Sequence, residues 1–139
     1  MLTPQILADK TADCFKRKQI RVCVEQIDGI PVIRLKPNAL GSAEIELELR
    51  FSQTEGGVMT EYFARIAAVN FGAELAYGLN ELNCSAQIGS YAVLRDNLIY
   101  RYQLYLRSEL GCDSAVINSL ELVLNQIDFD YAQITELLK

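Results

Sequence analysis

Apolar and polar residues alternate with a period of two in residues 20–35, which is typical of β-strands. The dipeptide Asp28-Gly29 lies in the middle of this stretch and favours a two-residue type I′ turn. Such a turn pairs Val24 with Ile33, apolar against apolar, and continuing the register pairs Val22 with Leu35. We therefore expect an antiparallel hairpin here.

The most regular alternation follows in residues 44–51, where glutamates alternate with apolar residues. In the expected sheet, Glu44, Glu46 and Glu48 lie across from Arg21, Arg34 and Lys36. A row of carboxylates could hold a cation or act as an acid–base pair. Exposed carboxylates next to basic side chains more commonly form ordinary ion pairs. We interpret the row as a solvated, charge-paired sheet face.

A helical period of 3.6 residues predicts helices at both ends of the chain. In residues 3–18, Thr3 can cap a helix that has Pro4 at its first position. The last helix can be capped by Asp113 or Ser114. Its broad apolar stripe consists of Val116, Ile117, Leu120, Val123, Leu124, Ile127, Tyr131, Ile134 and Leu138.

Small residues recur every four positions in residues 60–83, which we interpret as a third, central helix capped by Thr60. These small residues are Ala64, Ala68, Gly72 and Ala76. Each interior glycine destabilises a helix by about 1 kcal/mol relative to alanine, so a close approach of another backbone would have to offset it. We therefore predict that the four residues form an interaction stripe against a partner helix or a second subunit.

A second hairpin is predicted in residues 87–106, with its turn at Asp96-Asn97, because both turn residues tolerate the left-handed conformation. Its tyrosines on one shared face are Tyr91, Tyr100 and Tyr102. Such a face could line a ligand pocket or stack nucleobases, although aromatic pairs across strands are more often sheet packing.

In chain order these elements read α-β-β-β-α-β-β-α. They predict an α+β fold in which helices pack on an antiparallel five-stranded sheet. The 139 residues suit one domain, so we assign residues 1–139 to a single unit.

The composition argues against several classes of function. Thirteen basic and eighteen acidic residues give a net charge of -5, which argues against a nucleic-acid binder. The chain has no histidine, which excludes Ser-His and Cys-His catalysis and imidazole metal sites. No glycine-rich phosphate loop or nucleophile motif occurs. We predict no enzyme activity, no cofactor and no metal.

The spacing of the cysteines and the hydropathy of the chain indicate its cellular compartment. Cys14, Cys23, Cys84 and Cys112 are isolated, with no C-x-x-C pair. We see neither a secretory signature nor an apolar run long enough to cross a membrane. The expectation is a cytoplasmic protein with reduced thiols and no membrane contact.

Two motifs carry a family resemblance. The central helix is expected to end in Leu79-Asn80-Glu81-Leu82-Asn83, and the hairpin that follows reads Ala92-Val93-Leu94-Arg95-Asp96-Asn97-Leu98-Ile99-Tyr100-Arg101-Tyr102. With the element order, they resemble the bacterial YbjN-type family, whose fold is similar to that of type III secretion chaperones. The resemblance implies a non-enzymatic, usually dimeric protein that binds other proteins or modulates regulatory pathways. It also implies that relatives bind extended client polypeptides, and it carries over no catalytic residues.

The leading hypothesis is a protein-interaction module, chaperone-like or regulatory, that acts as a homodimer on an unknown protein client or partner. The first alternative is a small-molecule-binding domain or enzyme with a pocket between the tyrosine-rich strands and a helix. The second is a subunit whose acidic sheet face docks a basic partner.

Overall fold

A computed structural model describes residues 1–35 and 45–139, with three helices and six strands in this part of the chain. The α+β class is as predicted, but the sheet has six strands instead of five, and the element order is α-β-β-β-β-α-β-β-α. The helices are α1 (Pro4–Arg17), α2 (Ala73–Ser85) and α3 (Cys112–Leu137). The strands are β1 (Val24–Ile27), β2 (Ile30–Leu35), β3 (Glu46–Thr54), β4 (Gly57–Ala68), β5 (Ser90–Leu94) and β6 (Asn97–Leu106).

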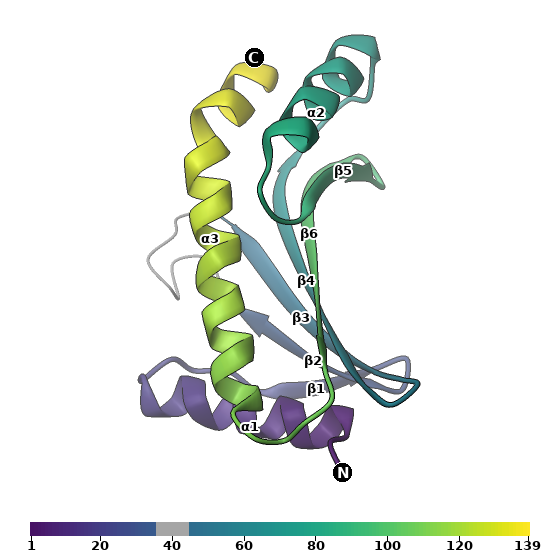
Figure 1. The fold of residues 1–139 in the computed structure, drawn as a ribbon. Coiled ribbons are helices and arrows are strands. Elements are labelled where there is room, and N and C mark those ends of the chain that lie inside the picture. Colours follow the sequence, from purple (N-terminus) through teal and green to yellow (C-terminus); the bar gives the residue numbers. More distant parts are fainter. Residues whose placement is uncertain (36–44) are drawn as a thin grey trace.

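The strands form one antiparallel sheet in the order β1-β2-β3-β4-β6-β5. The long α3 runs across one face of this sheet, with α1 at one end of the helix and α2 beside the other end (Figure 1). Buried side chains of all three helices share one core with apolar residues of the strands. The helices therefore occupy one side of the sheet.

The additional strand, β4, corrects the predicted helix over residues 60–83. Val58, Thr60, Tyr62 and Ala64 of β4 are fully buried, while Met59, Glu61 and Phe63, which alternate with them, point to the other face. A spacing of four residues is also a multiple of the strand period of two, so the small-residue row could not distinguish a helix from a strand. Only the second half of the predicted helix is helical, as α2.

The first hairpin matches its prediction. Asp28 and Gly29 have φ angles of 52° and 81°, and Val24 pairs with Ile33. The predicted pair of Val22 with Leu35 falls outside the ladder because β1 begins only at Val24.

The second hairpin turns one residue earlier than predicted. Its turn residues are Arg95 and Asp96, with φ angles of 51° and 61°. The register consequently shifts by two, so that Tyr91 pairs with Tyr100 instead of Tyr102. A shift of two keeps the same side chains on the same face, so the predicted tyrosine-rich face is preserved.

The terminal helices form largely as expected. The hydroxyl oxygen of Thr3 accepts a hydrogen bond from the Ile6 amide at 3.1 Å, and Pro4 is the first residue of α1. In contrast, α3 starts after Gly111 (φ 68°), with no side-chain cap from Asp113 or Ser114. A glycine reaches this left-handed conformation without the steric penalty of a side chain.

Candidate functional site

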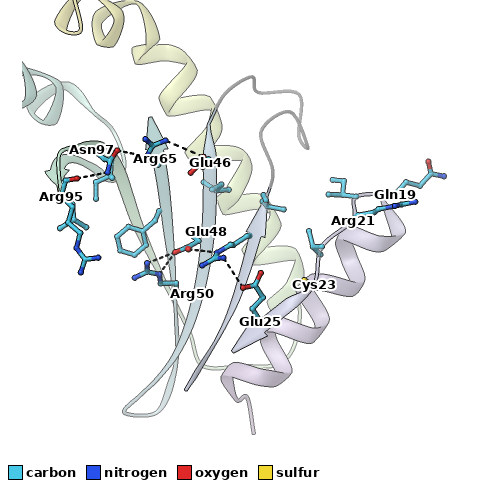
Figure 2. A pocket seen from close by; sticks show the side chains of 18 residues that line it. Gln19, Arg21, Cys23, Glu25, Glu46, Glu48, Arg50, Arg65, Arg95 and Asn97 are labelled. Carbon is cyan, nitrogen blue, oxygen red and sulfur yellow. Dashed lines mark hydrogen bonds and ion pairs between the residues drawn. The ribbon is translucent and has the colours of Figure 1, made fainter. Parts of the chain in front are cut away.

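The sheet face that points away from the helices is charged, with one aromatic ring in its centre. Glu48 of β3 faces Arg34 of β2 on one side and Phe63 of β4 on the other. Arg65 of β4 faces Glu46 of β3. Directly opposed residues of antiparallel strands lie on the same side of a sheet, so these side chains form one continuous surface. Figure 2 shows Glu46, Glu48 and Arg65 projecting from the strands.

Glu48 holds two arginines in place. Its carboxylate accepts hydrogen bonds from Arg34 Nε at 3.1 Å and from Arg50 Nε at 2.8 Å. Arg34 also lies 3.4 Å from Glu25. The prediction that the glutamate row forms ordinary ion pairs is confirmed for Glu48. Glu44 and Lys36, which belonged to that prediction, lie outside the described residues.

Phe63 lies between guanidinium groups from both neighbouring strands. The guanidinium carbon of Arg50 is 4.5 Å from the ring centre, and that of Arg101 is 5.6 Å away. Arg101 is itself held by Glu61, with Nη2 and Oε2 2.9 Å apart. These distances fit cation–π contacts, which fix the positions of both the ring and the arginines.

A groove of about 1260 Å³ lies over this face. Gln19, Arg21 and Cys23, in the segment that follows α1, lie at one end (Figure 2). Arg95 and Asn97 of the second hairpin lie at the other end. We call this feature the open-face groove. Its apolar lining includes Ile20, Val22, Phe63, Leu94 and Ile99.

The open-face groove is net positive in an acidic protein. Its charged lining residues are Arg21, Arg34, Arg50, Arg65, Arg95, Glu25, Glu46 and Glu48. Among the residues that the structure describes, five arginines and three glutamates give this lining a charge of +2, whereas the full sequence carries -5. The groove therefore differs from the acidic sheet face that the glutamate spacing suggested.

The tyrosines of the second hairpin do not line the open-face groove. Tyr91 and Tyr100 are buried, and their hydroxyls donate hydrogen bonds to Asp130 Oδ2 at 2.7 Å and to the Ile88 carbonyl at 2.5 Å. Burial raises the pKa of both side chains above its ordinary value, and the nearby Asp130 carboxylate raises it further. They are structural residues of the core.

The predicted interaction stripe does not lie on one helix. Ala64 is buried in β4, and Ala68 is exposed at the end of the same strand. Gly72 is exposed just before α2, and Ala76 is half-buried within α2. The four residues therefore form no continuous surface, and the idea of a backbone approach along this row is wrong.

Two helices do approach each other closely at Gly78, a residue that was not part of the predicted stripe. A Cβ atom at this position of α2 would collide with the Leu137 side chain of α3. The glycine thus allows the two helices to pack together.

The remaining candidate groups are scattered. Cys23 and Cys84 are exposed, Cys14 is half-buried and Cys112 is buried, where desolvation raises the pKa of its thiol. Within residues 1–35 and 45–139, no three metal-ligating side chains come together. Among the helices that the structure describes, none has the length and apolar character needed to cross a membrane.

Several groove residues were missed by the sequence analysis, namely Arg50, Phe63, Arg65 and Arg95. Two of them follow from one unrecognised signal. Met59, Glu61, Phe63 and Arg65 alternate with buried residues, which is the period of a strand. Once residues 57–68 are assigned to a strand, Phe63 and Arg65 fall on the face of the glutamate row.

Comparisons with protein-family models, with curated proteins and with solved structures give no match.

Proposed function

We propose that this chain is a non-enzymatic protein-interaction module, chaperone-like or regulatory, that binds a polypeptide in the open-face groove and acts as a homodimer. The observation that carries the proposal is the exposed sheet face, on which Phe63 lies among oriented arginines. The side chains of Arg34, Arg50 and Arg65 are 55%, 44% and 46% exposed, so a partner can reach them.

The residue types on this face support a protein partner. Aromatic residues and arginine are enriched in protein interfaces and among the residues that dominate binding energy. The ion pairs of Glu48 already hold Arg34 and Arg50 in place, so binding loses less side-chain entropy there. The resemblance to the YbjN-type family, whose relatives bind other proteins, supports the same proposal.

The homodimer would use the helices on the other side of the molecule. Tyr77 of α2 is 69% exposed and Phe129 of α3 is 84% exposed. Aromatic residues are enriched in the cores of protein interfaces. Tyr77 and Phe129, and not the small-residue row, therefore support the proposed homodimer.

A mass measurement in solution tests the homodimer. Analytical ultracentrifugation at micromolar concentration should give twice the 15.6 kDa chain mass. Phe129→Glu should shift the mass toward one chain, because a buried unpaired charge is unfavourable in an interface. The matched control is Lys16→Glu on the exposed side of α1. A wild-type monomer would contradict the dimer.

An unbiased displayed peptide library tests polypeptide binding. Peptides selected on the wild-type protein should bind Phe63→Ala about tenfold more weakly, the loss expected at a central aromatic contact. They should bind Phe129→Ala, the control on the helix side, as well as they bind wild type. Failure to enrich any peptide would contradict the proposed function, and so would equal binding to both variants.

The proposed location is the cytoplasm. Cys23 and Cys84 expose free thiols, which persist in a reducing compartment. This part of the proposal would fail if the natural protein were recovered with these two cysteines oxidised.

A further inference from the structure

The charge balance of the open-face groove indicates the chemistry of its occupant. The groove carries five arginines against three glutamates, although acidic residues outnumber basic ones in the whole chain. Positive charge is therefore concentrated on this face. A ligand with carboxylates would be attracted here and repelled by most of the remaining surface.

The central arginines are fixed but keep unused hydrogen-bond donors. Arg65 Nε donates to the Asn97 side-chain oxygen at 2.8 Å, and its Nη1 lies 3.8 Å from Glu46. A guanidinium has five N–H donors, so these contacts leave some of them available. Arg34 and Arg50 share the carboxylate of Glu48, and Arg34 uses one further nitrogen toward Glu25. The three arginines can therefore bind ligand carboxylates without breaking their own contacts.

Arginines also lie at both ends of the groove. Arg21 and Arg95 are exposed and form no ion pair with any residue that the structure describes. Arg95 occupies a turn position with a φ of 51°, which asparagine or glycine adopts with less strain. A residue that is locally unfavourable but places a cation at the groove is typical of a functional surface.

Apolar side chains lie between the charges. Phe63 is half-buried at the centre, and Ile99 lies beside it, across from Arg65. Ile20 and Val22 line the end near the segment that follows α1. An occupant must therefore combine carboxylates with apolar side chains along its length. An extended polypeptide does so when every second residue, which points to the same side, includes both acidic and apolar side chains, because successive side chains point to opposite sides.

A polypeptide fits better than a nucleic acid or a small molecule. Glu25, Glu46 and Glu48 interrupt the basic surface and would repel a continuous row of phosphates. The ring of Phe63 already has two guanidiniums against it, which leaves it poorly placed to stack on a base. The volume of about 1260 Å³ also exceeds the ~300–1000 Å³ that is usual for a small-molecule pocket.

We propose that the open-face groove binds an extended, acidic polypeptide segment, with its carboxylates on the arginines and an apolar side chain against Phe63. This inference rests on the proposed function and specifies the chemistry of the partner.

The test uses three synthetic peptide pools and the 139-residue chain. The peptides of each pool have apolar residues at every third position, so that both sides of the extended chain carry apolar and polar side chains, and the remaining positions are all Glu, all Gln or all Lys. Fluorescence anisotropy at low salt should show tightest binding of the Glu pool. The Gln pool should bind at least about tenfold more weakly, and added salt should weaken the Glu pool most.

Charge-reversal variants test whether the peptides bind in the open-face groove. The double variant Arg21→Glu/Arg95→Glu removes two cations that form no ion pair among the described residues, so it is not expected to disturb the fold. It should weaken binding of the Glu pool by at least about tenfold and improve binding of the Lys pool. Lys16→Glu makes a charge reversal of the same sign outside the groove and should leave both affinities within about twofold.

The possible failures are distinguishable. If the Gln or Lys pool binds as tightly as the Glu pool, the acidic partner is wrong, while the proposed binding of a polypeptide stands. If both charge variants weaken the Glu pool equally, the assignment to the groove is wrong. If a single-stranded oligonucleotide binds more tightly than every pool, the partner class is wrong. If no pool and no library peptide binds, the proposed function fails as well.

Discussion

At the scale of single residues, Asp130 connects the last helix to the second hairpin. Its side chain is 4% exposed and accepts hydrogen bonds from the Tyr91 hydroxyl at 2.7 Å and from Gln126 Nε2 at 2.9 Å. Gln126 Oε1 in turn accepts from the Gln87 amide at 3.2 Å. A buried polar network of this kind stabilises a fold only while its members remain paired.

Asp130→Ala should therefore lower the free energy of unfolding by about 1–3 kcal/mol, because it leaves the buried Tyr91 hydroxyl and Gln126 amide without their acceptor. Urea unfolding measures this change. Asp128→Ala is the matched control, since Asp128 is exposed two residues earlier on the same helix. Its effect should stay within about 0.5 kcal/mol. Equal losses in the two variants would contradict the structural role of Asp130.

The buried tyrosines predict instability at alkaline pH. Burial raises the pKa of Tyr62, Tyr91 and Tyr100 above the usual value of about 10. Their contribution to stability is complete below the pKa of the unfolded chain and is lost as the pH rises toward the folded-state value. The free energy of unfolding should therefore fall steeply above about pH 10.

Tyr62→Phe tests this pH dependence, because it removes one of the three titrating groups. Above about pH 10 the slope of unfolding free energy against pH should become less steep by about 1.4 kcal/mol per pH unit. Urea unfolding at several alkaline pH values gives the slope. An unchanged slope would show that Tyr62 does not titrate on unfolding.

At the scale of elements, the sequence correctly predicted the helices and strands for which the hydrophobic period and the turn or cap residues indicate the same structure. The hairpin at Asp28-Gly29 and the helix that follows Thr3 are examples, because the chemistry of their turn or cap is local. The strand at Gly57–Ala68 was missed since the four-residue spacing of the small-residue row suggested a helix. Its true period is apparent only from the burial of Val58, Tyr62 and Ala64 against the helices, which is a tertiary effect.

Packing between α2 and α3 predicts a coupling between Gly78 and Leu137. Gly78→Ala should gain helix propensity but force the Leu137 side chain to move. In a Leu137→Ala background the same substitution meets free space. A double-mutant cycle by urea unfolding should therefore show that Gly78→Ala is more favourable in that background by at least about 0.5 kcal/mol. Additive effects would contradict the contact.

The turn between β5 and β6 predicts a conflict between stability and binding. Arg95→Asn relieves a left-handed arginine and should stabilise the protein by up to about 1 kcal/mol, while it weakens binding of the acidic peptide pool. Arg21→Asn removes a charge from the groove without changing a turn, so it should weaken binding with little effect on stability. Thermal unfolding and anisotropy measure the two effects. A loss of stability in Arg95→Asn would contradict this account of the turn.

At the scale of the whole molecule, helices cover one face of the sheet, and no described helix covers the other face, where we propose that a partner binds. The glutamate spacing predicted the charge pairing of this exposed face, which Glu48 confirms. The sequence did not predict the groove, because its lining comes from segments distant in the chain, such as Arg21, Phe63 and Arg95. Only the strand order brings these residues to one surface.

The face that contacts a bound polypeptide can be measured directly with a photo-cross-linking residue. Benzoylphenylalanine at position 63 probes the open-face groove, and the same residue at position 129 probes the helix side. After irradiation with a selected peptide, mass spectrometry should find the peptide attached at position 63 and not at position 129. Attachment at position 129 alone would contradict the account, because the polypeptide would then bind the helices and not the exposed sheet.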